Sequence, residues 1–94
     1  MTINEYQQEC LKTMPKNLYR GEQALRSIMS ISYDVGCLMD TYKHVIYDGR
    51  PLNKADMYYW LGSLASEIAI CADAFDCDLE KAMTWNWNKS AGKE

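Results

Sequence analysis

Apolar residues recur at helical spacing through four stretches of the chain, and polar residues separate them. The spacing predicts helices over about residues 3–14, 22–47, 54–75 and 79–88, which is an all-α fold of four helices. The second helix carries an apolar stripe of Leu25, Ile28, Met29, Val35, Gly36, Met39, Tyr42 and Ile46. The third is apolar almost all round, so we expect it to be buried on two sides, against its own domain and against a partner subunit.

Residues that favour helix ends flank these stretches. Thr2 and Glu5 fit a capping box at the start of the first helix. Gly49 is suited to a left-handed cap at the end of the second helix. Asn53 and Asp78 are expected to be the N-caps of the third and fourth helices. The four boundaries are therefore predicted by local chemistry as well as by periodicity.

Composition narrows the class of protein. The 94 residues are expected to form one domain, 1–94, with a polar tail from about residue 90. Apolar residues make up 48% of the chain, which excludes a disordered chain. The net charge of −3 and the scattered basic residues give no nucleic-acid surface, and no apolar run is long enough for a membrane span. We expect a soluble, cytoplasmic protein.

The four cysteines, Cys10, Cys37, Cys71 and Cys77, form no C-x-x-C pair, and the single histidine does not complete a zinc site by spacing. Reduced thiols are therefore expected, three of them as small core residues. Cys37 is of interest because of its position, although a buried apolar role is favoured over a reactive one.

One small group of polar residues is placed so that it can form an inward-facing site. Residues three or four apart on a helix are neighbours, and this spacing occurs in both long helices. The candidate pocket residues are Asp34, Cys37 and Asp40 in the second helix, and Trp60, Ser63 and Glu67 in the third.

These residues, with several short motifs, resemble the MazG-like all-α nucleoside triphosphate pyrophosphohydrolases over nearly the full length of the chain. The resemblance is carried by residues 1–7, 34–40, 48–52, 61–62 and 78–80, with Asn86 and Lys89. It implies a four-helix bundle assembled as a dimer. It also implies a site in which carboxylates of two helices hold Mg²⁺ and activate a water against the α-phosphate of a nucleoside triphosphate.

The chain departs from the family pattern at the metal ligands. By the resemblance, Asp34 and Asp40 stand at acidic positions of the first motif, whereas Cys37, Trp60 and Ser63 replace carboxylates. A thiol is too soft for Mg²⁺, an indole cannot ligate it, and a serine hydroxyl is a weak ligand. No metal or other cofactor is therefore expected, and Asp34 and Asp40 are the ligands if there is one.

Two functions follow from this comparison. The favoured one is a catalytically impaired relative that acts by binding, either a nucleotide in the vestigial pocket or a protein partner, as an inhibitor or regulator of the kind that phages and mobile elements sometimes carry. The alternative is an active Mg²⁺-dependent pyrophosphohydrolase that releases pyrophosphate from NTPs or dNTPs with a rearranged site of Asp34, Asp40 and Glu67. The resemblance also assigns phosphate contacts to Asn86 and Lys89, although an exposed polar face of the last helix is the favoured explanation for them. In both cases the expected partners are a second copy of the chain, as a dimer or higher oligomer, and no nucleic acid or membrane.

Overall fold

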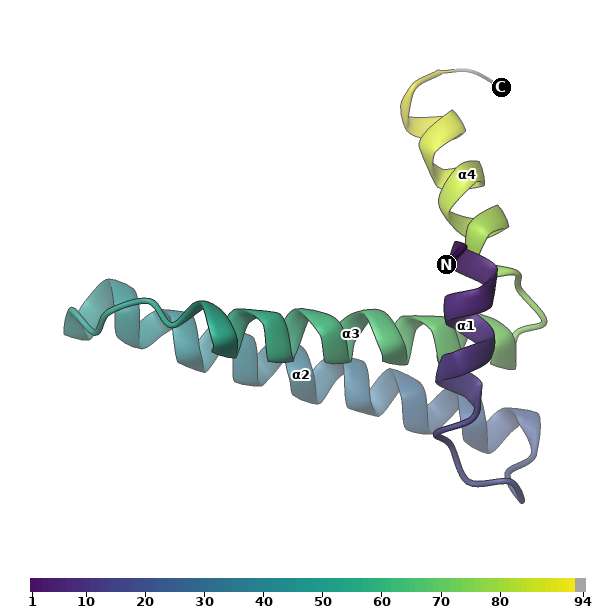
Figure 1. Cartoon of the computed structure of the whole chain (residues 1–94), viewed down its shortest axis with the longest axis horizontal. Helices are drawn as coiled ribbons and strands as arrows, with labels where there is room; N and C mark the ends of the chain where they lie inside the picture. The colour runs from purple at the N-terminus through teal and green to yellow at the C-terminus, as the bar shows by residue number, and fades with distance from the viewer. Residues whose placement is uncertain (93–94) are drawn as a thin grey trace.

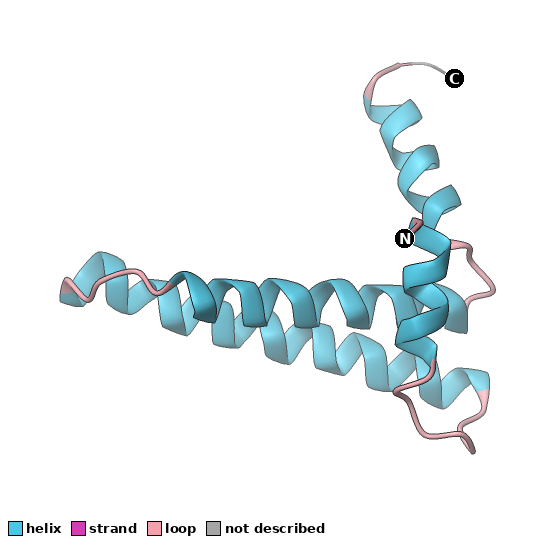
Figure 2. Cartoon of the chain, in the orientation of Figure 1, coloured by secondary structure: helices cyan, strands magenta, loops and turns pink. Residues whose placement is uncertain are grey.

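The computed structural model describes residues 1–92, and these residues form four helices and no strand (Figures 1 and 2). The helices are α1 (Ile3–Leu11), α2 (Arg20–Asp48), α3 (Lys54–Ala74) and α4 (Leu79–Ser90). The predicted all-α class and the number of helices are confirmed. Helix α1 is shorter than expected, because residues 12–14 form a turn. Within the described part of the chain, no helix combines the length and the apolar character that crossing a bilayer requires.

The helix ends are formed by the residues that the sequence indicated. The Thr2 hydroxyl accepts a hydrogen bond from the Glu5 amide at 3.0 Å, and the Glu5 carboxylate accepts one from the Thr2 amide at 2.8 Å. The Asn53 side chain caps α3 by accepting a hydrogen bond from the Ala55 amide, and the Asp78 side chain caps α4 by accepting one from the Lys81 amide. Gly49 ends α2 with φ of 68°, a backbone conformation that costs glycine little. All four predicted caps are confirmed.

The two long helices form an antiparallel hairpin, and the short helices lie at its open end. Helix α2 packs along α3, and residues 49–53 connect them at the far end (Figure 1). Helix α1 crosses this open end against α3, and α4 contacts α1 and α3 before it extends away (Figure 1). The radius of gyration is 15.6 Å, whereas a compact domain of this length has about 12 Å. The single chain is therefore elongated.

The apolar core lies at the open end of the hairpin and is small. Its buried members are Cys10, Ala69, Ile70, Ala74 and Leu79, contributed by α1, α3 and α4. The four thiols are unpaired, but only Cys10 is buried, and Cys77 is exposed. The expectation that three cysteines are core residues is wrong for Cys77, because it lies in the turn between α3 and α4.

Buried amides join the elements at this end. The Gln7 side chain of α1 donates to the carbonyl of Ala69 at 3.0 Å and to that of Cys77 at 3.2 Å, and it accepts from the Leu79 amide at 3.1 Å. Gln23 of α2 donates to the Ile70 carbonyl at 3.0 Å. Because both glutamines are buried, these bonds fix the positions of α1, α2 and α4 on α3.

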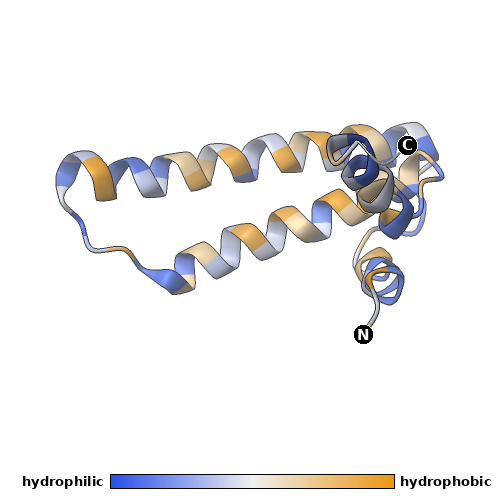
Figure 3. Cartoon of the chain, turned by 90° about the horizontal axis from the view of Figure 1, so that it is seen from above, coloured by the Kyte–Doolittle hydropathy of each residue, from blue (hydrophilic) through white to orange (hydrophobic). Residues whose placement is uncertain are grey.

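The apolar stripe of α2 faces away from α3. Its members Leu25, Ile28, Met29, Val35, Met39, Tyr42 and Ile46 are all exposed in the single chain. The side of α2 that packs on α3 instead buries the polar residues Gln23, Ser27 and Asp34. Apolar segments accordingly recur along both long helices, well beyond the end where α1 packs (Figure 3). The stripe is a feature of the outer surface of the chain and contributes little to its core.

Candidate functional site

Asp34 and Ser63 join the two long helices near the middle of the hairpin. The Ser63 hydroxyl of α3 donates a hydrogen bond of 2.6 Å to a carboxylate oxygen of Asp34 in α2. Asp34 is only 6% exposed, so this bond satisfies a carboxylate that water scarcely reaches. Its geometry fits a positioning role between two helices.

A pocket opens beside this pair between α2 and α3. It has a volume of about 480 Å³ and is lined by Ser32, Tyr33, Gly36, Cys37, Asp40, Thr41 and Trp60. The half-buried Trp60 ring meets the Tyr33 ring edge-on, with centroids 6.5 Å apart, and meets the Tyr59 ring at 4.9 Å. The structure thus gathers Cys37, Asp40 and Trp60 around one pocket, and aromatic rings form one wall of it.

Tyr33 also interacts with the thiol in this pocket. A hydrogen bond with Cys37, with smaller contributions from the charges of Cys37 and from burial, raises the pKa of the Tyr33 phenol. The phenol, like that of an ordinary tyrosine, is protonated at neutral pH and can donate a hydrogen bond. The wall of the pocket is uncharged except for Asp40.

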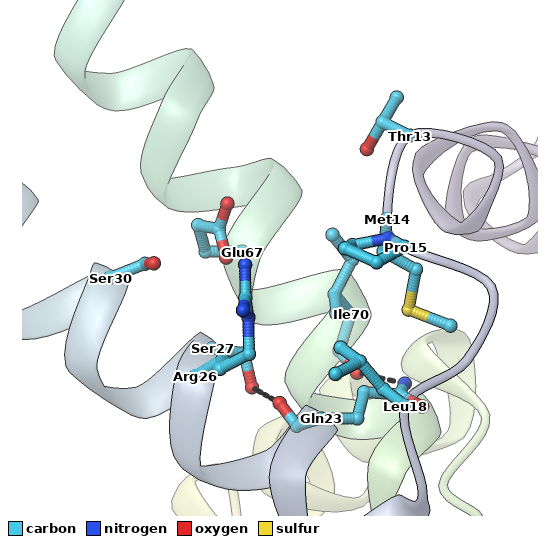
Figure 4. A pocket seen from close by; sticks show the side chains of 10 residues that line it. All are labelled: Thr13, Met14, Pro15, Leu18, Gln23, Arg26, Ser27, Ser30, Glu67 and Ile70. Atoms are coloured by element: carbon cyan, nitrogen blue, oxygen red, sulfur yellow. Dashed lines mark hydrogen bonds between the residues drawn. The ribbon is translucent and has the colours of Figure 1, made fainter.

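Glu67 lies in a neighbouring, smaller cavity of about 170 Å³ between α2, α3 and the turn after α1 (Figure 4). The Arg26 and Glu67 side chains point toward one another in this cavity (Figure 4). Burial is the main cause that raises the pKa of Glu67, the charge of Asp34 raises it further, and Arg26 opposes both. Glu67 is thus coupled electrostatically to Asp34, although it does not line the aromatic pocket.

The residues present do not fit a magnesium site. Asp34 and Asp40 are six residues apart on α2 and so point about 120° apart around the helix axis. The Asp40 side chain is 67% exposed and lies near the amine of Lys43 at 3.6 Å and the imidazole of His44 at 3.8 Å. Among residues 1–92, no group of three His, Cys, Asp or Glu side chains comes close enough to hold a metal ion. The repeated interval of three residues from Asp34 through Cys37 to Asp40 therefore does not bring the two carboxylates together.

Asn86 and Lys89 lie apart from the pocket. Both are exposed on α4, which contacts α1 and α3 at the other end of the hairpin. The Lys89 amine lies over the Trp85 ring, 5.4 Å from its centroid, as a cation–π contact. Within one chain, these two residues do not join Trp60 and Cys37, because α4 leaves the body of the hairpin.

The sequence pattern did not point to three residues that shape the site, Tyr33, Arg26 and Ser30. Tyr33 precedes Cys37 by four residues, and Arg26 and Ser30 precede the predicted Asp34 by eight and four residues. Residues at this spacing lie on neighbouring turns of one helix face, so the spacing offered a signal.

Comparison of the chain with protein-family models, with curated proteins and with solved structures finds no match. The resemblance to the MazG-like family therefore remains a hypothesis, and the geometry of the pocket is the basis for a function.

Proposed function

We propose that the chain is a catalytically impaired MazG-like protein that acts by binding, and that its pocket takes a flat aromatic ligand such as the base of a nucleotide. The observation that carries this proposal is the pairing of the buried Asp34 carboxylate with Ser63, beside a pocket walled by Trp60. Where the family pattern requires converging carboxylates, this chain has a satisfied hydrogen bond and an indole.

The lining of the pocket favours the base over the phosphates. The Tyr33 and Trp60 rings offer faces on which a base can stack, and Thr41 and Cys37 offer polar groups for its edge. The one charged residue among the described residues of the lining is Asp40, whose carboxylate lies near the Lys43 amine at 3.6 Å, and none of them is a basic residue that could hold phosphate groups. We therefore expect a nucleoside to bind at least as tightly as its triphosphate.

Two further parts of the proposal concern partners. We propose that the chain pairs with itself, because a small core and many exposed apolar residues leave much surface to be covered. A protein partner, bound as an inhibitor or regulator, is the second candidate for the ligand, and it is favoured by the exposed Trp85 and Trp87 of α4.

The competing function is an active Mg²⁺-dependent pyrophosphohydrolase with a rearranged acidic site. The observation in its favour is the electrostatic coupling between Glu67 and Asp34. The separation of Asp40 from both, and its contacts with Lys43 and His44, count against it. We therefore rank it second.

One experiment separates these functions. Pyrophosphate release is measured from NTPs and dNTPs with Mg²⁺ or Mn²⁺, and binding of nucleosides, monophosphates and triphosphates is measured by calorimetry. We expect no metal-dependent turnover and saturable binding that Trp60→Ala weakens roughly 5- to 150-fold, the value of one base–aromatic stack. Trp85→Ala, on exposed α4, is the matched control and should bind as the unaltered chain does.

Turnover that requires Mg²⁺ and disappears in Asp34→Ala would establish the enzyme and end the proposal. Absence of both turnover and binding for every nucleotide and nucleoside would exclude the nucleotide ligand and leave the protein partner. Equal losses in the Trp60 and Trp85 variants would show that the ligand does not use this pocket.

A further inference from the structure

The outward stripe of α2 has the spacing of a helix-pairing surface. Seven of its positions follow one another at alternating intervals of three and four residues. They are Leu25, Ile28, Ser32, Val35, Met39, Tyr42 and Ile46, named here the outer seam. This alternation keeps side chains in a line on one face and is typical of helices that pack side by side along their length. The outer seam runs over three heptads, nearly the whole of α2.

The outer seam is apolar and uncovered in the single chain. Its members other than Ser32 are large apolar residues, each at least 43% exposed. Together with the adjacent Met29, their exposed fractions correspond to roughly 700 Å² per chain, so two copies that cover them fully would bury up to about 1,400 Å², which is within the usual range of stable interfaces. The seam is therefore large enough to support a dimer.

Gly36 gives an independent indication that another backbone approaches α2. A glycine inside a helix costs about 1 kcal/mol relative to alanine. A Cβ added to Gly36 would meet nothing within 4 Å, so packing within the chain does not require glycine there. The midpoint of the outer seam falls between Val35 and Gly36. A second helix that crosses there would come closest at the position where the side chain is absent.

A second copy in antiparallel orientation fits the residues of the seam. If the two α2 helices are related by a two-fold axis between Val35 and Gly36, Leu25 faces Ile46 of the other copy, Ser32 faces Met39 and Met29 faces Tyr42. Ile28 faces Lys43, whose apolar stem can pack against it while the amine stays in water. Near the axis, small residues are opposite larger ones, Ser32 opposite Met39 and Gly36 opposite Val35, which allows the two helices to pack closely. A parallel pair in register would instead align the two helix dipoles unfavourably.

We propose that two copies of the chain associate through the outer seams of α2, antiparallel, about a two-fold axis at Val35 and Gly36. This inference rests on the proposed self-association and specifies its surface and orientation. Gly36 also lines the aromatic pocket, so the second copy lies at the mouth of that pocket. Ligand binding and dimerisation are therefore expected to depend on each other.

The surface is tested by sedimentation velocity on the full chain and two variants. Met39→Lys places a charge in the seam, and Tyr47→Lys places the same charge on α2 outside it, at a residue that is 81% exposed. Lysine and methionine have similar helix propensities, and Met39 is 66% exposed, so the fold should persist, with circular dichroism as the check. We expect dimers for the unaltered chain and Tyr47→Lys, and a dissociation constant raised roughly 100-fold or more for Met39→Lys.

A monomeric unaltered chain would overturn the proposed self-association as a whole. A dimer that Met39→Lys leaves intact, with normal helicity, would overturn the outer seam while leaving self-association in place. The two failures are therefore distinguishable.

The orientation is tested by cross-linking single added cysteines in a background that carries Cys37→Ser, Cys71→Ser and Cys77→Ser, which leaves only the buried Cys10. In the antiparallel pair, a Leu25→Cys chain cross-links with an Ile46→Cys chain, and neither cross-links with itself. Efficient cross-linking of each variant with itself, and not with the other, would contradict the antiparallel arrangement.

Discussion

Ser63→Ala removes the donor that satisfies the buried carboxylate of Asp34. The bond between them is 2.6 Å long, and Asp34 is only 6% exposed, so water cannot easily replace the lost hydroxyl. Hydrogen bonds to charged groups contribute about 1.5–3 kcal/mol, and leaving a charged partner unsatisfied costs at least as much. We therefore expect Ser63→Ala to lower the free energy of unfolding by about 2 kcal/mol, a large share of the roughly 5–14 kcal/mol expected for this length.

The assay is urea unfolding followed by circular dichroism, arranged as a double-mutant cycle. Asp34→Asn keeps the size of the side chain and its acceptor oxygen but removes the charge, so we expect a loss below about 1 kcal/mol. In Asp34→Asn the added Ser63→Ala should then cost little, which gives a coupling energy of about 1 kcal/mol or more. Ser66→Ala, on the same helix, is the control for the difference in helix propensity between serine and alanine.

The reasoning would be refuted if Ser63→Ala were no more costly than Ser66→Ala. A coupling energy close to zero would lead to the same conclusion, because it would mean that the pair does not hold α2 on α3. In either case the interpretation of the site as a satisfied, metal-free pair would lose its energetic basis.

The remaining predictions concern pH, the buried amide and the turn. Burial and the charge of Asp34 raise the pKa of Glu67 in the folded chain. The ionised Glu67 carboxylate therefore destabilises the fold. This loss of stability is absent below the pKa of the unfolded carboxyl and is complete once the pH has risen through the raised, folded pKa. Glu67→Gln should therefore raise the melting temperature at pH 7 but not at pH 4. Gln7→Ala removes three buried hydrogen bonds and should cost about 2–5 kcal/mol in urea unfolding. Gly49→Ala forces alanine to φ of 68° and should cost about 1–2 kcal/mol by the same measurement.

Each of these has a contrary outcome. A Glu67→Gln variant whose melting temperature falls at pH 7 would mean that the ionised carboxylate is stabilising. If Gln7→Ala unfolds at the urea concentration of the unaltered chain, the amide does not join α1 to α3. A Gly49→Ala variant of unchanged stability would mean that the end of α2 adopts another conformation.

The sequence predicted the local structure well because local chemistry determines it. The Thr2 and Glu5 capping box, the Gly49 cap and the Asn53 and Asp78 caps depend on groups within a few residues of each other. Helical periodicity placed all four helices, with errors of up to three residues at their ends. Such features need no knowledge of the tertiary arrangement.

The features that could not be predicted from the sequence depend on how the helices pack. The spacing brought Cys37 and Trp60 to one pocket, but it also assigned Asp40 to the face of Asp34, and the helical rotation over six residues separates them. The direction of α4, which removes Lys89 from the pocket, is set by the Gln7 amide and the turn before Leu79. The amphipathic pattern also could not show that the most buried residues of α2 are the polar Gln23, Ser27 and Asp34, because such a pattern favours apolar residues at these positions.

The central claim is that the pocket between α2 and α3 has exchanged metal-binding carboxylates for a satisfied pair and an indole. The most direct test is a titration of the protein with Mn²⁺, followed by electron paramagnetic resonance, on the unaltered chain and on Asp34→Asn. The account predicts the same weak, non-stoichiometric binding for both. One tightly bound Mn²⁺ per chain that Asp34→Asn abolishes would contradict it.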